Sequence, residues 1–378
     1  MSLYKSVEPF TEASEIRDFD VNADAMEMSV CERAFLCGLI RDNRPKRILE
    51  IGVASGATTA VILNAIKLLG LSTELISVDI CERFYKDTTK STGYLAESWK
   101  NENGGGNHIC FYGKVIAECI DDIAKDGLID FVVLDTSHQV PGEILDFITV
   151  LPYLKKNAVV VLHDVMMLLE FPRHDATRIL FNSVSGEKYY FFLKNELPNI
   201  GAFGLTEDTF RNVADVYSAL IQPWVYFPSK YHLQKYRECI EKKYGNKLND
   251  YFQLILTMQE KYAPNNRIRN QIGDNLGGLI SWWKKQTKVY IYGAGQVGNM
   301  YARFAYNNGL PVSAMVVSDG QSIEDNQAQE LGFSINYYSE IRNEIKEAGV
   351  IVAIDGDLRI EIMNILKSEG AKNIWSVL

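Results

Sequence analysis

Two apolar runs of the chain end on side chains that can handle protons or metal ions. The run 129–135 (IDFVVLD) closes on Asp135, with His138 three residues later, and the run 158–163 (AVVVLH) is followed by Asp164. Carboxylate oxygens are the ligands that Mg²⁺ prefers, and an imidazole can take up a proton near neutral pH. If these side chains meet in space, they could bind a hard cation and deprotonate a hydroxyl group.

A glycine-rich turn follows an earlier apolar run. Residues 50–56 (EIGVASG) include the end of the run 47–51 and precede a helical pattern at 57–70. Small residues let the backbone approach a ligand closely, and the amides at a helix start favour negative charge. The spacing of the two glycines differs from GxGxxG, which fits the pyrophosphate of a dinucleotide. The turn therefore predicts a different ligand, unless it is only a tight strand-to-helix connection.

Asp79 strengthens the case for a ligand at this turn. It ends the next apolar run, 74–79 (ELISVD). A carboxylate at that strand end can accept hydrogen bonds from both hydroxyls of a ribose. The turn and Asp79 together indicate a nucleoside-type ligand.

Apolar runs that alternate with helical patterns predict the elements that hold these residues. Strands are expected at 47–51, 74–79, 108–112, 129–135, 158–163, 188–193 and 200–205, and helices at 26–43, 57–70, 142–154 and 175–184. Such alternation is typical of βαβ units in a parallel sheet. The short connection between the last two strands predicts an antiparallel hairpin at one edge. Because parallel strands open at one end of a sheet, Asp135, His138 and Asp164 should lie beside the glycine turn.

Over roughly residues 30–205 the chain resembles class I S-adenosylmethionine-dependent methyltransferases. The ExGxxxG spacing is similar to their cofactor loop. The resemblance implies an α/β fold with a seven-stranded, doubly wound sheet whose last strand is antiparallel. It also implies S-adenosylmethionine as cofactor, bound by the turn, the strand-end acids and a residue after the third strand: Glu50, Gly52, Ser55, Gly56, Asp79, Lys114 and Asp135.

The pair Asp135-x-x-His138 and His163-Asp164 resembles the branch of that family that methylates sugar hydroxyls. The resemblance implies that Asp135 and Asp164 ligate a divalent metal, Mg²⁺, and that His138 is the general base. A hard cation lowers the pKa of a bound hydroxyl, and an imidazole accepts its proton. The branch commonly has glycine where this chain has Thr136. Metal-free methylation of a small molecule stays open as an alternative.

A second glycine-rich turn, Gly293-Ala-Gly295-Gln-Val-Gly298, lies between an apolar run at 288–292 and a helical pattern. Asp319 follows at the end of the next predicted strand, where a ribose-binding acid would stand. The segment resembles small Rossmann-like domains of bacterial polysaccharide and sugar-nucleotide enzymes, which implies a nucleotide or nucleotide-sugar ligand. A degenerate domain that serves assembly or substrate placement is an alternative. The rival from another class is an NAD-binding protein with a regulatory first domain.

Length and composition fit a globular protein of several domains. The chain has 378 residues, of which 47% are hydrophobic and 23% charged. We predict a methyltransferase domain over 1–206, a helical linker or insert over 207–285 and a small Rossmann-like domain over 286–378. The insert is expected to be either a dimerisation region of a homo-oligomer or a solvated spacer.

Charge and hydropathy limit the classes of partner that the protein is expected to bind. The net charge of −9 disfavours nucleic acid as a partner. No apolar stretch reaches the roughly 18–20 residues of a membrane span, and the start does not read as a signal peptide. The six cysteines contain no CxxC pair and are expected to be reduced thiols of a cytoplasmic protein. A small-molecule or glycan acceptor is the partner that fits.

Overall fold

The computed structural model describes residues 4–15, 28–104, 106–190, 199–272, 275–321, 323, 327–354 and 358–376. The chain divides into two compact units, each with its own sheet. The first unit comprises residues 1–222 and 235–251, and the second comprises 223–234 and 252–378.

The first unit is built on an eight-stranded sheet in the order β1-β7-β8-β6-β5-β2-β3-β4. Its strands are β1 (Tyr4–Lys5), β2 (Arg47–Ile51), β3 (Glu74–Asp79), β4 (His108–Tyr112), β5 (Ile129–Leu134), β6 (Leu154–His163), β7 (Glu187–Tyr190) and β8 (Ile200–Gly204). Strand β8 runs antiparallel to both of its neighbours, whereas β2 to β6 pair in parallel.

All seven predicted strands are present, and β1 is an additional one. The predicted pairing of the last two strands is confirmed, with Glu187 opposite Gly204. Their expected position at the edge is wrong, because β1 pairs with β7 on its outer side. A two-residue strand is too short to show an alternating pattern, so the sequence carries no sign of it. Residues 191–193 of the predicted strand, the connection after it and residues 26–27 of the first predicted helix lie outside the described residues.

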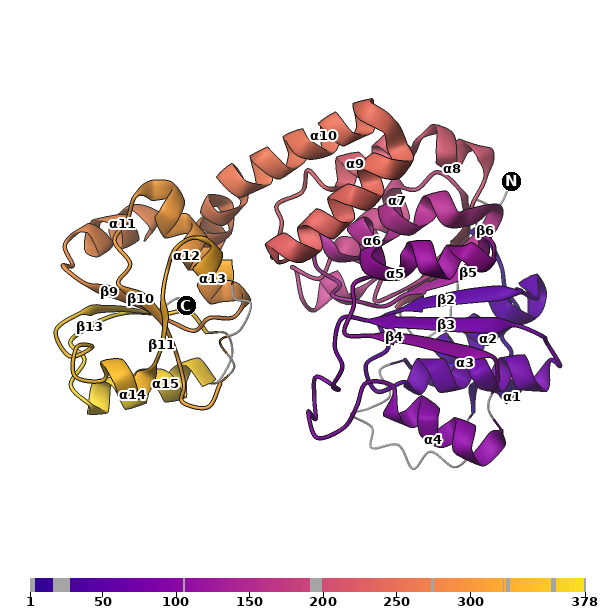
Figure 1. Ribbon diagram of the computed structural model, residues 1–378, viewed down its shortest axis with the longest axis horizontal. Helices are drawn as coiled ribbons and strands as arrows, with labels where there is room; N and C mark the ends of the chain where they lie inside the picture. Colours follow the sequence, from indigo (N-terminus) through magenta and orange to yellow (C-terminus); the bar gives the residue numbers. More distant parts are fainter. Residues whose placement is uncertain are drawn as a thin grey trace. The chain divides into compact units, whose positions relative to one another are not determined.

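Helices cover both faces of this sheet (Figure 1). They are α1 (Thr11–Ser14), α2 (Val30–Asn43), α3 (Ala57–Leu68), α4 (Tyr94–Asn103), α5 (Ile116–Ile123), α6 (Gly142–Val150), α7 (Ala176–Ser183), α8 (Glu207–Arg211) and α9 (Val213–Ala219). Helices α1 to α4 contact one another on one side, and α5, α6, α7 and α9 do so on the other. Apolar side chains of α2 and α3 form a buried core with inward residues of β2, β5 and β6.

The second unit contains a five-stranded parallel sheet in the order β11-β10-β9-β12-β13. Its strands are β9 (Val289–Tyr292), β10 (Ala314–Val317), β11 (Ile335–Tyr337), β12 (Gly349–Val352) and β13 (Asn373–Ser376). Its helices include α11 (Leu276–Lys284), α12 (Gln296–Asn308), α13 (Gln327–Glu330), α14 (Tyr338–Ile341) and α15 (Leu358–Ser368). The prediction that the strand before the second glycine turn opens a separate parallel sheet is confirmed.

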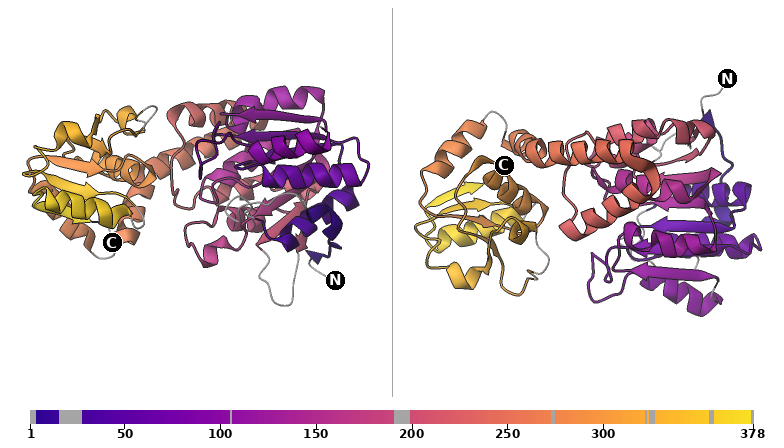
Figure 2. Two further views of the ribbon diagram at one scale, coloured as in Figure 1. Left: turned by 90° about the horizontal axis from the view of Figure 1, so that it is seen from below. Right: turned by 45° about the horizontal axis from the view of Figure 1, so that its top comes forward.

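Strand β9 shows how the two faces of this sheet are filled. Val289 and Ile291 belong to one core with α11 and α12, while Tyr290 and Tyr292 belong to another with α14 and α15. Figure 2 shows these helices on the two sides of the sheet. Alternate residues of a strand point to opposite faces, so one strand contributes to both cores.

The long helix α10 (Lys230–Ile272) has one non-helical residue, Gly245 (φ 71°, ψ 176°). Its residues 235–251 belong to the first unit and 252–272 to the second. The segment 207–285 is thus shared between the two units, and its division as a separate insert stays a prediction, as does its role in oligomerisation. No helix of the described residues is both long and apolar enough to cross a membrane.

Candidate active site

The first glycine turn passes directly against the end of β5. Gly52 and Gly56 have φ values of 91° and 84°, which glycine adopts readily. A Cβ atom on Gly52 would lie 1.8 Å from the backbone oxygen of Asp135, and one on Gly56 would lie 2.7 Å from Cα of Gly93. Both glycines are therefore needed sterically, and the first places the turn beside Asp135.

Asp79 fastens this turn from the neighbouring strand. Its Oδ2 accepts hydrogen bonds from the backbone amides of Val53 (2.8 Å) and Ala54 (3.0 Å), and its Oδ1 accepts one from the amide of Cys81 (2.7 Å). A carboxylate offers about four lone-pair sites, so these bonds leave capacity for a ligand. The sequence did not reveal this fastening role, and the ribose contact stays a prediction.

The other predicted cofactor residues differ in their access to a ligand. Glu50 is fully buried, and its Oε2 accepts hydrogen bonds from the hydroxyls of Thr59 (2.7 Å) and Ser77 (2.6 Å). Burial raises the pKa of Glu50 to about 7. Ser55 is also buried, whereas Lys114 is exposed. Glu50 therefore braces the turn from inside the fold, and Lys114 is open to solvent.

Asp135, His138 and Asp164 come together where β5 and β6 end. Nε2 of His138 lies 3.1 Å from Oδ2 of Asp164 and 3.8 Å from Oδ1 of Asp135. One donor atom of each residue lies within 4.8 Å of the others. His138 and Asp164 have φ values of 56° and 58°, which are uncommon outside glycine and frequent at functional sites. The juxtaposition expected from parallel strands is present; the roles of the three residues stay predictions.

His163 is buried behind the two aspartates. Its Nδ1 lies 3.2 Å from Oδ1 of Asp135, and its Nε2 lies 3.6 Å from Oε2 of Glu32. Burial opposes the charged imidazolium, but the surrounding carboxylates raise the pKa of His163 well above its usual value. Burial likewise opposes ionisation of Asp135, yet His163 keeps the pKa of that carboxyl lowered. For Asp164 burial dominates and its pKa is raised.

Glu143 is a site residue that sequence reasoning missed. It lies on α6 and is fully buried. Its Oε1 accepts hydrogen bonds from the backbone amides of His138 (2.6 Å) and Thr136 (3.3 Å), and it lies 3.4 Å from Nδ1 of His138. Carboxylates therefore flank both nitrogens of the His138 ring, Glu143 beside Nδ1 and Asp164 beside Nε2. The only signal was an acid early in the helix after His138, and spacing does not tell whether such an acid is buried.

Two further residues reach the site from distant parts of the chain. The side-chain amide of Asn199 donates to Oδ1 of Asp164, and its backbone amide donates to Oε1 of Glu32 (3.2 Å). Glu32 also accepts a hydrogen bond from the amide of Ser29 (2.7 Å) in the capping box that starts α2. Only the fold brings these residues to the ends of β5 and β6.

The second glycine turn lies in the second unit. Cβ atoms on Gly293 and Gly298 would lie 2.6 Å from the backbone oxygen of Ala353 and 1.8 Å from that of Gly293, so packing requires both glycines. Gly295 has an ordinary φ of −76°, and a Cβ atom on it would meet nothing within 4 Å. Asp319 follows β10, and its Oδ1 accepts a hydrogen bond from the hydroxyl of Ser339 (2.5 Å). The nucleotide-binding role of these residues stays a prediction.

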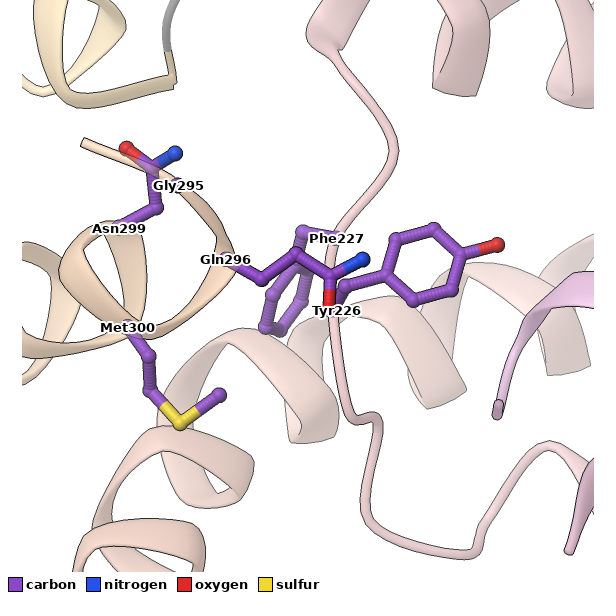
Figure 3. A pocket seen from close by; sticks show the side chains of 6 residues that line it. All are labelled: Tyr226, Phe227, Gly295, Gln296, Asn299 and Met300. Atoms are coloured by element: carbon purple, nitrogen blue, oxygen red, sulfur yellow. The ribbon is translucent and has the colours of Figure 1, made fainter. Parts of the chain in front are cut away.

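A cavity of about 190 Å³ adjoins Gly295, and Figure 3 shows side chains extending from the first turns of α12. Pockets for drug-sized ligands span roughly 300–1,000 Å³, so this cavity does not enclose a whole dinucleotide. It is lined by Tyr226, Phe227, Gly295, Gln296, Asn299 and Met300.

Comparison with known proteins bears on the first unit. Residues 49–165 match a family model described as a methyltransferase domain. None of the curated proteins matches the chain significantly.

Solved structures that resemble the chain include three methyltransferases. The O-methyltransferase TomG of Streptomyces achromogenes, in complex with SAM, is 18% identical and covers 54% of this chain and 92% of its own (TM-score 0.37). The SAH-bound methyltransferase PaMTH1 of Podospora anserina is 16% identical, covering 52% and 88% (0.38). An O-methyltransferase of Bacillus cereus in complex with SAH is 17% identical, covering 48% and 85% (0.36).

The matched segment runs from β2 to the residue after Asp164, and so contains the glycine turn and all three residues of the cluster. The match of residues 49–165 to the methyltransferase model confirms the predicted enzyme class, an S-adenosylmethionine-dependent methyltransferase.

Proposed function

We propose that the first unit transfers a methyl group from S-adenosylmethionine to a hydroxyl oxygen of a sugar-like acceptor, at the cluster of Asp135, His138 and Asp164. The observation that carries this proposal is the position of His138. Its Nε2 faces two carboxylates at the strand ends, and Asp135 of the same cluster contacts Gly52 of the glycine turn. A donor held by the turn would present its methyl group beside this imidazole.

The residues of the turn bind and orient the donor. Exposed Lys114 and the remaining lone pair of Asp79 are available to its polar groups. The first amides of α3 favour the donor's carboxylate. Glu50, with its hydrogen bonds to Thr59 and Ser77, keeps β2 and the turn in place.

His138 accepts the proton of the acceptor hydroxyl. As the hydroxyl oxygen forms its bond to the methyl carbon, the sulfur–carbon bond breaks and the hydroxyl proton passes to Nε2 of His138. Glu143, 3.4 Å from Nδ1, holds the ring and stabilises the imidazolium that results. The products are the methyl ether and S-adenosylhomocysteine.

Asp135 and Asp164 fit a hard cation by donor type. Within the described part of the chain, Oδ2 of Asp135 has no hydrogen-bond partner, so this oxygen is available as a ligand. We propose that the two carboxylates hold Mg²⁺, which would lower the pKa of an acceptor hydroxyl. One observation favours a metal-free form of the same reaction: His163, whose pKa the surrounding carboxylates raise, lies 3.2 Å from Oδ1 of Asp135, where its charged form would repel a cation.

A chelation assay separates the two forms. Methyl transfer to a panel of glycosides and small polyols is measured in EDTA, then after addition of Mg²⁺. Loss of activity in EDTA and its return with Mg²⁺ support the metal site. Full activity in EDTA shows that the reaction needs no cation, and His138 then deprotonates the acceptor without one. No transfer to any hydroxyl acceptor, with transfer to an amine instead, contradicts O-methylation.

A further inference from the structure

The second unit contains another cavity, of about 260 Å³, which shares Phe227 with the cavity beside Gly295. All of its lining residues belong to the second unit. It will be called the Arg303 cavity. The residues that bear on its chemistry are Phe227, Lys230, Glu260, Arg303, Tyr306 and Glu330.

Arg303 is the unusual member of this lining. Its side chain is 13% exposed, and its guanidinium carbon lies 4.4 Å from the centre of the Phe227 ring. Among the described residues its guanidinium has no hydrogen bond, and the nearest carboxylate oxygen, Oε1 of Glu260, is 4.0 Å from Nη1. A guanidinium has five N–H donors in a planar fork, which suits acceptors that offer two oxygens side by side. The geometry leaves them facing a cavity that can hold acceptors.

The charges around the cavity balance. Lys230 and Arg303 are opposed by Glu260 and Glu330. The backbone amide of Lys230 donates to Oε1 of Glu330 (3.0 Å), and its Nζ donates to the backbone oxygen of Glu330 (3.1 Å). An anion in the cavity would meet the Glu260 carboxylate close to Arg303. A neutral ligand that both accepts and donates hydrogen bonds suits such a lining better.

Aromatic side chains supply the apolar part. Phe227 is buried behind the Arg303 guanidinium, and Tyr306 is 61% exposed at the cavity. Arg303 and Tyr306 stand three residues apart on α12, so they share one face of that helix. An exposed aromatic ring beside the Arg303 guanidinium and a carboxylate can hold a polyhydroxylated ring by its C–H face and by its hydroxyls.

We infer that the Arg303 cavity binds a sugar ring. Neighbouring hydroxyls of the sugar accept hydrogen bonds from Arg303 and donate to Glu260, while Tyr306 packs against the ring. The volume of about 260 Å³ is slightly below that of pockets for drug-sized ligands, which suits a single ring. The inference rests on the second unit alone and holds whether or not the first unit methylates a sugar.

Binding is tested on the full chain by saturation-transfer NMR. The probes are the methyl glycosides of glucose, galactose, rhamnose and N-acetylglucosamine, together with UDP-glucose and UDP-N-acetylglucosamine. The first variant is Arg303→Lys, which keeps the positive charge and removes the planar set of guanidinium donors. The second is Tyr306→Ala, which replaces an exposed side chain. The matched control is Tyr262→Ala, whose ring is 50% exposed and does not line the cavity. Thermal midpoints show that each variant is folded.

We expect saturation of the sugar ring protons of at least one probe. That signal should fall at least fivefold in Arg303→Lys and Tyr306→Ala, and should persist in Tyr262→Ala. A signal from methyl glycosides means that the sugar suffices, and a signal only from UDP-sugars means that the sugar is recognised in its nucleotide-linked form. No ring-proton signal from any probe, or an unchanged signal in Tyr306→Ala, overturns the inference. So does displacement by millimolar inorganic phosphate, which would mark an anion site.

Discussion

His138 has a buried carboxylate on one side of its ring and two partly exposed carboxylates on the other. Strand ends in a parallel sheet predicted the residues on the open side, because chain order and strand order fix where Asp135 and Asp164 lie. The supporting residues were not predictable. Glu143 and Glu32 lie on helices whose rotation decides whether an acid is buried, and a sequence pattern does not report that rotation for a single residue.

Replacing Glu143 by Gln tests its action on the imidazole. Gln keeps an oxygen that can accept from the amides of Thr136 and His138 but removes the charge beside Nδ1. Groups that orient a functional histidine typically change activity by about 10–100-fold when altered. We expect kcat to fall by about that factor with KM for the donor unchanged. The control is Glu207→Gln on the surface, and an unchanged kcat in Glu143→Gln would exclude the orienting role.

Replacing Asp79 by Ala tests the predicted ribose contact. Backbone amides occupy three of the roughly four lone-pair sites of this carboxylate, so the change removes about one acceptor position for a ribose. S-adenosylhomocysteine should therefore bind more weakly by about 1–1.5 kcal/mol. Calorimetric titration measures this loss. Since Asp79 also fastens the turn through Val53 and Ala54, the variant's unfolding free energy is measured beside it. Affinity equal to that of the unaltered protein contradicts the assignment.

The glycine turn and the two strands beside it form the element on which the site depends. Their order was predictable, because buried strands and a tight turn leave plain patterns of apolar residues and glycine. The two-residue strand β1 was not predictable. The division of α10 between the two units was not predictable either, because its helical periodicity continues through residues that belong to different units.

Gly52→Ala should damage the turn, whereas Gly70→Ala should not. Both glycines have positive φ, but a Cβ on Gly52 meets the backbone oxygen of Asp135 and one on Gly70 meets nothing within 4 Å. Strain from φ alone is of order 1–3 kcal/mol, and Gly70→Ala should show only that. Gly52→Ala should lose more stability and should also lose S-adenosylhomocysteine binding. Equal effects of the two changes would show that the close approach to Asp135 is unimportant.

Glu50 should make the first unit less stable as the pH rises. Its usual pKa is 4.5, and burial raises it to about 7. The folded state therefore binds more protons than the unfolded state between these values, and stability falls as pH rises through that window. About 1.36 kcal/mol per pKa unit gives a loss of up to about 3 kcal/mol. Urea unfolding at pH 5 and pH 8 should show this loss relative to Glu50→Gln; a pH-independent difference contradicts it.

At the scale of the whole molecule, the chain combines two sheets with separate cores. Composition and the two glycine turns predicted two α/β folding units. The boundary between them was harder to predict, because the helices between the sheets are polar on much of their surface and their few buried residues decide which core they join.

The core of the second unit makes a specific prediction about its boundary. Trp283 of α11 is fully buried against Tyr301 and Phe304, and its indole N–H donates to the backbone oxygen of Pro311 (2.7 Å). Loss of a buried Trp costs about 3–5 kcal/mol. A fragment of residues 275–378 should thus unfold cooperatively in urea, and one of 286–378 should be markedly less stable. Equal stability of the two fragments contradicts a core role for α11.

The proposal that His138 is the base of methyl transfer is tested most directly by single-turnover kinetics. His138→Asn is the better variant beside His138→Ala, because Asn tolerates the positive φ at this position and cannot accept the proton. His232→Ala on α10 is the control. Turnover should fall by about 10²–10⁴-fold in both His138 variants, with S-adenosylhomocysteine affinity unchanged. Turnover at the unaltered rate in His138→Asn, with the protein folded and the cofactor bound, would contradict the central claim.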